Sequence, residues 1–362
     1  MKVLMISGDP GVWDPKSETG KRIEEYRQVL GELAILVCRG NVFSFFAGFL
    51  KGLMMLWSHE YDVITAQDIE HSFLAWVFSR LFQTPWQMQI HTDIFSPHFV
   101  KHSMFDINMV RVRLARFLLP RASCIRVVSE RIKNSIFGTS DVLKDIRCPV
   151  IVLPIFVDVE KIKNAPIQTD LRKKYPGRFI ILMASRITKE KNIGFAIEAF
   201  AEIMKELPPP LTPPPYEGGG GGEGVMPLLL IVGDGSELQN LEFQVSSFKI
   251  QDFVIFEPHT SDIASYYKTC DLFLLTSNYE GYGRTLVEAA AAGAKIVSSG
   301  VGIASEILEP ECVFRAGDME DLKNKLTAVL HGRLPFPRQI LHQTKGEYLG
   351  LYLDSFKQCL KK

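Results

Sequence analysis

The sequence predicts an α/β protein with two doubly wound, Rossmann-like domains that face each other across a cleft. Short apolar runs, typical of buried parallel strands, alternate with amphipathic runs typical of helices along the chain. The alternation restarts after a connection at Pro154–Asp158, and 362 residues suit two domains better than one. Ligands of such folds bind at the carboxyl ends of the strands, so we expect the site between the domains.

The first domain is expected to cover residues 1–160. Its predicted strands are Lys2–Ser7, Ala34–Cys38, Val63–Ala66, Trp86–His91, Cys124–Val128 and Val150–Leu153. Its predicted helices are Lys21–Leu33, Phe43–Trp57, Ser72–Leu81, Val110–Leu119 and Glu130–Phe137. The most hydrophobic stretch, Val42–Trp57, is short for a membrane span and contains Lys51, so we expect a helix packed in the core.

The second domain is expected to cover residues 161–340, and residues 341–362 are expected to form a C-terminal helix that returns to the first domain. The predicted strands are Phe179–Met183, Leu228–Val232, Val254–Phe256, Leu272–Thr276, Ile296–Ser298 and Cys312–Phe314. The predicted helices are Ile193–Glu206, Glu237–Val245, Ile263–Lys268, Thr285–Ala292, Ala304–Leu308 and Met319–Leu330. A proline- and glycine-rich segment, Pro208–Pro227, interrupts this pattern and is expected to be a disordered insertion.

Composition narrows the class of protein. Basic and acidic residues number 41 each, so net charge gives no reason to expect a nucleic-acid partner. The six cysteines form no CxxC pair and are expected to be reduced thiols, as in a cytoplasmic protein. The short apolar run near the N-terminus suits a first strand rather than a signal peptide. We therefore expect a cytoplasmic protein that is either soluble or attached to a membrane surface.

The stretch SNYEGYGRTLVEAAAAG at 277–293 carries the strongest chemical signal. Glu280 and Glu288 are eight positions apart, and the glycine-bearing turn 281–284 separates an apolar strand from an alanine-rich helix. A strand, a glycine turn and a helix start present backbone N–H groups to a phosphate, and carboxylates accept hydrogen bonds from hydroxyls. This combination indicates a sugar-nucleotide site. The alternative is a buried αβ unit with chance glutamates, which burial of Glu280 without a partner would make costly.

Two cations form a second candidate group. Arg186 and Lys191 lie in a predicted loop that follows the strand Phe179–Met183. At the carboxyl end of a strand they would face a ligand diphosphate. The alternative is a solvated basic loop.

His91 and Gly20 are the candidates in the first domain. His91 ends a predicted strand and could assist proton movement or hold a sugar hydroxyl. A metal site is the alternative, because His91, Asp93, His98 and His102 are close in sequence, but their spacing matches no metal motif. Gly20 is expected to open a helix at Lys21, where it either lets a phosphate or acceptor approach or is a plain loop glycine.

Two tempting motifs are incomplete. Gly20-Lys21 is not a P-loop, because Arg22 replaces Ser or Thr and Pro15 stands where the first glycine belongs. Gly233-Asp234-Gly235 lacks the third glycine of a dinucleotide fingerprint. Both absences count against a nucleotide hydrolase and a dehydrogenase.

With these residues the chain resembles the retaining glycosyltransferases of family 4, the glycosyl transferases group 1, which have the GT-B fold. The run from Glu280 to Glu288 resembles the family's Glu-x7-Glu motif, and Arg186 and Lys191 match its cations after the first strand of the second domain. Gly233 resembles its glycine turn, and His91 its histidine at a strand end.

The resemblance implies roles for these residues. Arg186 and Lys191 would neutralise the leaving diphosphate, Glu280 would hold donor-sugar hydroxyls and Glu288 the ribose. His91 would be a further catalytic residue. The remaining donor-binding residues would be Gly281, Tyr282, Gly283, Arg284, Thr285 and Gly233. Gly20 and Asp93 would lie on the acceptor side. Neither a metal nor another cofactor is expected.

The sequence thus predicts an enzyme that transfers a hexose from a nucleoside-diphosphate sugar to a hydroxyl of a glycan or lipid-linked acceptor, with retention of anomeric configuration. The alternatives are a sugar-nucleotide epimerase, a glycosyl phosphorylase or an inactive sugar-nucleotide-binding protein. Arginines mixed with apolar residues between Asp106 and Lys133 add the hypothesis that this segment contacts an anionic membrane. The alternative is an amphipathic helix whose arginines are merely solvated.

Overall fold

The computed structural model describes residues 1–38, 42–96, 99, 107–138, 146–206, 226–331, 333, 337–338 and 343–361. The chain divides into two compact units. The first unit contains Met1–Phe156 and Gln343–Lys362, and the second contains Val157–His342. The division therefore falls four residues before the expected boundary after residue 160 (160 minus 156), and the C-terminal helix belongs to the first unit.

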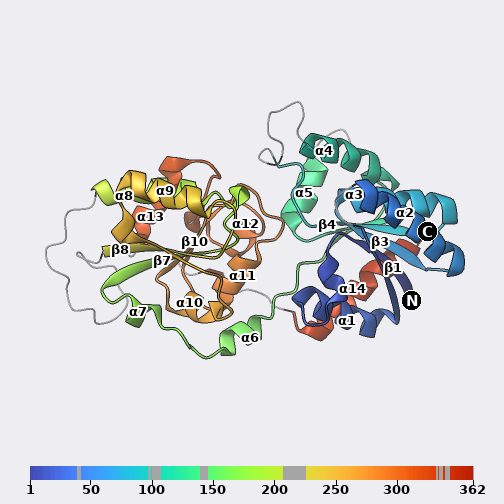
Figure 1. The fold of residues 1–362 in the computed structure, drawn as a ribbon, viewed down its shortest axis with the longest axis horizontal. Helices are drawn as coiled ribbons and strands as arrows, with labels where there is room; N and C mark the ends of the chain where they lie inside the picture. The colour runs from blue at the N-terminus through green and yellow to red at the C-terminus, as the bar shows by residue number, and fades with distance from the viewer. Residues whose placement is uncertain are drawn as a thin grey trace. The chain divides into compact units, whose positions relative to one another are not determined.

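A parallel sheet forms the centre of the first unit, in the order β2-β1-β3-β4-β5-β6. Its strands are β1 (Lys2–Ser7), β2 (Glu32–Val37), β3 (Val63–Gln67), β4 (Trp86–Ile90), β5 (Cys124–Val127) and β6 (Val150–Val152). Its helices are α1 (Glu18–Leu30), α2 (Val42–Ser58), α3 (Ile69–Phe82), α4 (Ile107–Leu118), α5 (Glu130–Gly138) and α14 (Lys345–Leu360). In Figure 1, α1 and α14 cover one face of this sheet, and α2, α3 and α4 cover the other.

Helix α1 begins and ends three residues earlier than the predicted Lys21–Leu33. The side chain of Ser17 caps it by accepting from the N–H of Gly20 at 2.9 Å. Gly31, with φ of +87°, ends it, because the next residues pair with β1. The expectation that Gly20 opens the helix is wrong. Gly20 lies in the first turn, where a Cβ would come within 1.9 Å of the Asp14 carbonyl oxygen. Glycine is therefore needed here because the loop before the helix packs against this turn.

Helix α2 contradicts the prediction of a helix packed in the core. Only one side of it contacts the unit: Gly48 and Gly52 lie so close to Cys38 and Phe78 that a Cβ would clash, and Leu56 is buried. The opposite side is open, and Phe43 and Trp57 are 90% and 88% exposed. The hydrophobicity of the segment predicted burial, but the sheet and α3 cover a single face of this helix.

The cysteine prediction is wrong for one pair. Cys124 on β5 and Cys359 on α14 are joined in a disulfide, with 4.9 Å between their Cα atoms. They are 235 residues apart in sequence, so no spacing motif signals the pairing. The contact exists because α14 returns to the first unit and packs against β5.

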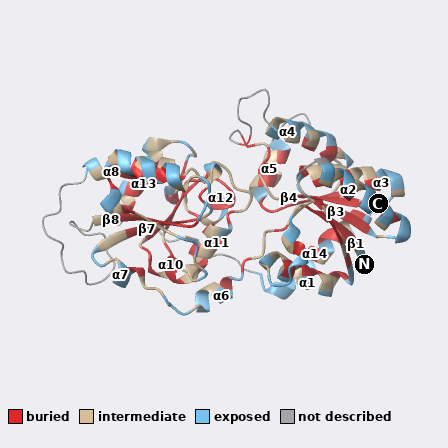
Figure 2. Ribbon diagram, in the orientation of Figure 1, coloured by how far each residue is buried: buried red, intermediate tan, exposed pale blue. Residues whose placement is uncertain are grey.

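The second unit also has a parallel sheet, in the order β12-β11-β10-β7-β8-β9. Its strands are β7 (Arg178–Ala184), β8 (Met226–Val232), β9 (Val254–Glu257), β10 (Leu272–Leu275), β11 (Ile296–Ser299) and β12 (Val313–Phe314). Its helices are α6 (Val159–Asn164), α7 (Leu171–Lys174), α8 (Ile193–Glu206), α9 (Leu238–Phe248), α10 (Ile263–Thr269), α11 (Arg284–Ala291), α12 (Ala304–Ile307) and α13 (Met319–Leu330). Figure 2 shows that in both units most strand residues are buried and the outward sides of the helices are exposed. The edge strands β6 and β9 are only partly buried.

The twelve predicted strands are present, and the predicted α/β architecture with two doubly wound units is confirmed. The predicted cleft between the units stays a prediction. The insertion predicted at Pro208–Pro227 is two residues too long at its end, because Met226 and Pro227 pair with Arg178 and Phe179 as the start of β8. Proline is tolerated at the first positions of a strand. The rest of the predicted insertion lies outside the described residues.

Candidate functional site

The candidate site lies at the point where the strand order of the second sheet reverses. From this point, β7, β8 and β9 follow one another toward one edge of the sheet. Strands β10, β11 and β12 follow one another toward the other edge. Loops that leave the carboxyl ends of two such neighbouring strands diverge to opposite faces and leave a crevice that binds ligands. The loop 185–192 after β7 and the loop 276–283 after β10 occupy this position.

Hydrogen bonds join these two loops to each other. The hydroxyl of Thr276 donates to the carbonyl oxygens of Lys191 and Asn192, both at 3.1 Å. The amide of Asn192 donates to the Oδ1 of Asn278 at 3.1 Å, and the Asn278 N–H donates to the Glu190 carbonyl at 2.9 Å. Two segments almost ninety residues apart therefore hold their charged side chains in fixed positions.

Lys191 and Glu280 form the central ion pair of the site. The Lys191 Nζ lies 2.5 Å from the Glu280 Oε1, and the side chains are only 16% and 14% exposed. The hydroxyl of Ser277 donates to the same carboxylate oxygen at 2.8 Å. The sequence predicted both residues as site residues but did not predict that they pair with each other.

The glycine turn leads into the N-terminus of α11. Gly283 adopts a left-handed conformation, with φ of +89°, and no side chain caps the helix there. The turn is held from behind, because the Ile303 N–H donates to the Tyr282 carbonyl at 3.0 Å. Gly302 permits this approach: its φ is +55°, and a Cβ there would come within 2.4 Å of the Tyr282 carbonyl oxygen. The start of α11 therefore presents backbone N–H groups that no side chain caps, an arrangement suited to binding an anion.

Glu288 lies one turn further along α11 and has two partners. It accepts from the Tyr267 hydroxyl at 3.3 Å and from the Arg284 guanidinium at 3.4 Å. Burial raises the pKa of Glu288 above its usual value, while Arg284 and the Tyr267 hydroxyl act in the opposite direction. These contacts fix the direction of the carboxylate.

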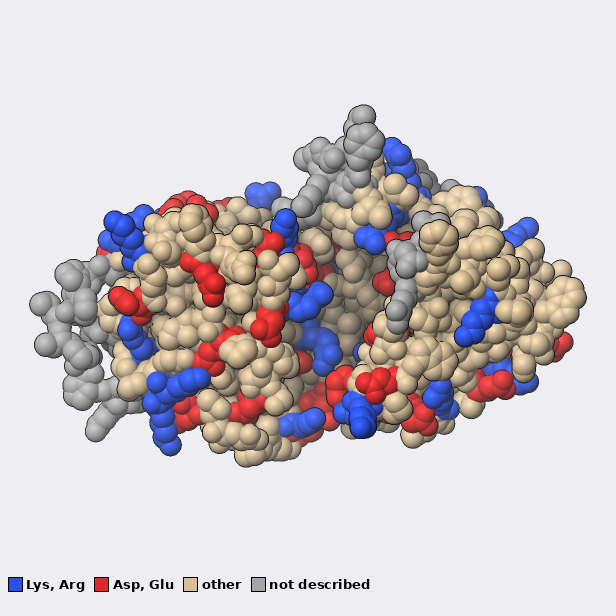
Figure 3. All heavy atoms as spheres, in the orientation of Figure 1, with Lys and Arg blue, Asp and Glu red and all other residues tan. Residues whose placement is uncertain are grey.

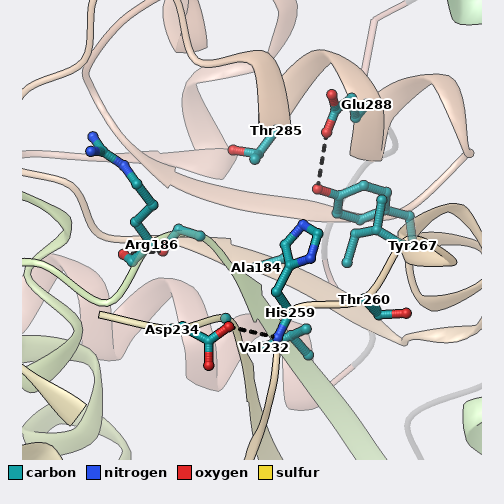
Figure 4. A pocket seen from close by; sticks show the side chains of 12 residues that line it. Ala184, Arg186, Val232, Asp234, His259, Thr260, Tyr267, Thr285 and Glu288 are labelled. Carbon is teal, nitrogen blue, oxygen red and sulfur yellow. Dashed lines mark hydrogen bonds between the residues drawn. The ribbon is translucent and has the colours of Figure 1, made fainter. Parts of the chain in front are cut away.

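A pocket of about 370 Å³ opens beside these residues. Its volume suits a small organic ligand. It is lined by Ala184, Ser185, Arg186, Val232, Gly233, Asp234, His259, Thr260, Ile263, Tyr267, Thr285 and Glu288. In Figure 4, Arg186 and the Tyr267–Glu288 pair lie on opposite sides of the view, with His259 between them. A ligand in the pocket would meet a cation on one side and a carboxylate on the other.

Close backbone packing shapes the floor of the pocket. Gly233, with φ of +143°, lies so near Ser185 that a Cβ would come within 2.0 Å of the Ser185 carbonyl oxygen. A Cβ on Gly235 would come within 2.1 Å of the Ile187 carbonyl oxygen. Asp234 accepts from the His259 N–H at 3.2 Å. Glycine is therefore needed at 233 and 235 because this turn packs directly against the loop after β7.

The predicted site residues of the second unit divide into two groups. Arg186, Gly233, Thr285 and Glu288 line the pocket. Lys191, Glu280 and the turn 281–284 lie on the two joined loops. The Arg186 guanidinium lies 3.3 Å from the Glu190 carboxylate, and the Arg186 side chain is largely exposed.

The remaining predicted residues lie in the first unit. His91 is half-buried at the end of β4, where burial first, and then the charges of Arg126 and Arg22, lower its pKa to about 3. Asp93 is buried and accepts from the Ser135 hydroxyl at 2.7 Å, so it ties its loop to α5. The alternative metal site includes His98 and His102, which lie outside the described residues.

Two residues of the site were missed from the sequence. Tyr267 is buried in α10, and nothing in the pattern of that helix distinguishes it from a core tyrosine. Gly302 follows β11 and has no motif of its own, yet it supports the turn 281–283. His259 and Thr260, which follow β9, also line the pocket.

Comparisons with known proteins identify a family for the part of the chain that carries the site. Residues 167–345 match the family described as glycosyl transferases group 1, and this part of the chain belongs to that family. The chain is 28% identical to alpha-monoglucosyldiacylglycerol synthase of Streptococcus pneumoniae over 70% of its own length and 55% of that protein. It is 27% identical to N-acetyl-alpha-D-glucosaminyl L-malate synthase of Bacillus anthracis over 54% of its length and 46% of that protein. The chain thus spans about half the length of these curated relatives.

Solved structures show the same fold. HepE of Anabaena, in complex with UDP-glucose, matches with a TM-score of 0.66 at 20% identity, covering 99% of this chain and 94% of that one. Sucrose-phosphate synthase of Thermosynechococcus elongatus matches with a TM-score of 0.72 at 15% identity, covering 99% and 94%. The predicted GT-B fold is therefore confirmed for the two units. Among the described residues, no helix has the length and apolar character needed to cross a membrane.

Proposed function

We propose that this protein is a glycosyltransferase that moves a hexose from a nucleoside-diphosphate sugar to a hydroxyl of a glycan or lipid acceptor, retaining the anomeric configuration and using no metal. One observation carries the proposal. A pocket at the strand-order reversal has an arginine on one side, a fixed carboxylate on the other and the N-terminus of α11 beside it. A nucleoside diphosphate has the matching groups, namely ribose hydroxyls and two phosphates.

Donor binding follows from the chemistry of these groups. Glu288 would accept hydrogen bonds from the ribose hydroxyls, since Tyr267 and Arg284 already fix its direction. The first N–H groups of α11 and the Arg186 guanidinium would bind the diphosphate. The complexes of HepE with UDP and with UDP-glucose support a uridine donor.

The catalytic step would be departure of the nucleoside diphosphate. The bond from the anomeric carbon to the phosphate oxygen breaks, and the acceptor oxygen bonds to the same face of that carbon. The acceptor proton passes to the departing phosphate oxygen. Lys191 and Arg186 would stabilise the charge that develops on this leaving group, and Glu280 would hold hydroxyls of the transferred sugar. This route needs no covalent enzyme intermediate.

The acceptor would be bound by the first unit. His91, with its lowered pKa, is a neutral imidazole near neutral pH and would exchange hydrogen bonds with hydroxyls without adding charge. Asp93 would position the loop that follows β4. The name of the pneumococcal relative describes synthesis of a glucosylated diacylglycerol, which supports a lipid acceptor and a place at a membrane surface.

Transfer with defined stereochemistry tests the proposal. The protein is incubated with UDP-glucose and a panel of diacylglycerol and glycan acceptors, and the anomeric proton of the first product is followed by NMR. We expect an α-linked product from the α-linked donor, together with stoichiometric UDP. A β-linked product would contradict retention. Donor epimerisation without acceptor, dependence on inorganic phosphate, or donor binding with no turnover would favour an epimerase, a phosphorylase or a binding protein, respectively.

A further inference from the structure

The first unit carries an exposed apolar stripe that the donor site does not use. Along α2, the residues Phe43, Phe46, Leu50, Met54 and Trp57 are all exposed. Their spacing of three and four positions places them on a single side of the helix, opposite the side that contacts the sheet. The stripe extends over fifteen residues, from Phe43 to Trp57, or about 21 Å at the usual helical rise.

Large apolar side chains also lie on the outer side of the neighbouring helices. Ile107, Val110 and Phe117 of α4 are exposed, and Phe117 packs edge-on against Trp76 of α3 at 5.0 Å. Helices α2, α3 and α4 form one layer over the sheet (Figure 1). Exposed apolar side chains are therefore present on α4 as well as on α2, with α3 packed against both helices.

The charges in this layer are predominantly basic. Helix α2 has Lys51 and no acidic residue, and α4 has three arginines and no acidic residue. Helix α3 has Arg80 and one acidic residue, Glu70, which forms an ion pair with Arg111 of α4. In Figure 3 the surface over α2 and α3 is mostly uncharged, with basic side chains on it.

We propose that α2 is an in-plane membrane anchor, which inserts the stripe from Phe43 to Trp57 among the acyl chains of an anionic bilayer. Apolar residues on one side, basic residues beside them and aromatic residues at both ends are the features of a helix that lies in a membrane interface. Lys51 and the exposed Arg113 and Arg116 would meet the lipid phosphates.

A second copy of the chain fits this surface less well than a lipid. Two such layers facing each other would bring the basic side chains of α2, α3 and α4 against their own copies. Within these three helices Glu70 is the one acidic residue, and it is already paired with Arg111. An anionic bilayer offers both the apolar interior and the opposite charge. The proposal goes beyond glycosyl transfer, because it assigns a role to a surface distant in sequence from the donor pocket.

Vesicle binding by the full chain tests the anchor. Wild type is expected to co-sediment with vesicles that contain phosphatidylglycerol, more weakly with pure phosphatidylcholine and more weakly as salt rises. The double variant Phe46→Ser/Met54→Ser is expected to bind about tenfold more weakly or worse. It lacks two large apolar side chains, and burial of each in the bilayer would contribute about that factor or more. An unchanged circular-dichroism spectrum and melting temperature would show that the variant is folded.

Phe243→Ser provides the matched control. Phe243 lies on α9 of the second unit and is 76% exposed, so the change removes a similarly exposed aromatic ring outside α2. We expect it to bind vesicles like wild type. Equal vesicle binding by the α2 variant and wild type would overturn the proposal. A wild-type dimer that dissociates in the α2 variant, without any vesicle binding, would replace the membrane with a second copy.

Fluorescence gives a readout of insertion. Lipids brominated on their acyl chains should quench the emission of the wild-type protein, and Trp57→Phe should remove most of this quenching. The protein has four tryptophans, so loss of quenching on a single substitution would assign the contact to α2. Quenching that is unchanged in Trp57→Phe would contradict insertion of this helix. Failure of sugar transfer would not affect either result.

Discussion

At the scale of single residues, the donor site depends on charges that are paired before any ligand arrives. Lys191 and Glu280 are mostly buried and lie 2.5 Å apart, which compensates the cost of removing each charge from water. In the proposed site, a diphosphate would bring further negative charge, and Lys191 would stabilise it while still contacting Glu280. Preorganised charge of this kind lowers the barrier to departure of an anionic leaving group.

Removing either cation should slow sugar transfer. Lys191→Ala and Arg186→Ala are each expected to lower kcat by about 10²-fold or more, the scale of losing one preorganised electrostatic group. Steady-state kinetics with a saturating donor measures this. Lys189→Ala, in the same loop and exposed, is the matched control and should turn over like wild type. Near-wild-type kcat in both Arg186→Ala and Lys191→Ala would remove them from the catalytic group.

His91 should stay neutral throughout the physiological range. Its pKa is lowered to about 3, first by burial and then by Arg126 and Arg22, so the neutral form is the stable one at any pH well above that value. The NMR signals of its ring should not shift between pH 5 and pH 8, whereas an ordinary histidine titrates near 6.5. A titration of His91 within that range would contradict the lowered pKa and show that burial and the two arginines do not hold the imidazole neutral.

At the scale of elements, the turn before α11 depends on a glycine in another loop. Gly302→Ala would place a Cβ within 2.4 Å of the Tyr282 carbonyl oxygen and should displace the turn that presents the α11 N-terminus. Gly293→Ala is the control, because its φ of +81° is also positive but its Cβ would meet nothing within 4 Å.

Both glycine variants should lose stability, by about 1–2 kcal/mol for a side chain forced into left-handed backbone. Only Gly302→Ala should also weaken UDP binding. Calorimetric titration and thermal denaturation separate the two effects. Equal UDP affinity in the two variants would mean that Gly302 does not support the phosphate site.

Most of the elements could be predicted from the sequence, because most of the parallel strands are short, buried and largely apolar runs. The edge strands β6 and β9 are only partly buried, but they are apolar enough to be predicted as well. The loops after β7 and β10 carry the motif residues where the strand order places a ligand. The predicted end of α1 at Leu33 is wrong, because Gly31 ends that helix earlier than its apolar periodicity indicates.

Other features depend on contacts that a sequence does not express locally. Hydrophobicity could not show that α2 is covered on one side only, since the amount of covering surface is decided by the sheet and by α3. Tyr267 looks like a core residue, and only its hydroxyl at 3.3 Å from Glu288 connects it to the site. The Cys124–Cys359 bond could not be predicted, because no local pattern shows that α14 packs against β5.

At the scale of the whole molecule, the proline- and glycine-rich segment should be dispensable. It joins α8, which ends at Glu206, to β8, which begins at Met226. Lengthening a surface connection adds little closure entropy, and this composition favours no packed structure. Replacing residues 208–225 with a short turn should leave the melting temperature and transfer rate close to wild type. A large loss of either would show that the segment contacts the site or a partner.

The central claim, that the pocket of the second unit binds a nucleoside-diphosphate sugar through Glu288, is tested most directly by calorimetric titration of UDP into wild type and Glu288→Gln. A charge-assisted hydrogen bond contributes about 1.5–3 kcal/mol, so the variant should bind at least about tenfold more weakly. Its thermal stability should not fall, because burial raises the pKa of Glu288 and the ionised carboxylate therefore destabilises the folded state at neutral pH. Equal UDP affinity in the two proteins, or no UDP binding by wild type, would contradict the assignment of this pocket.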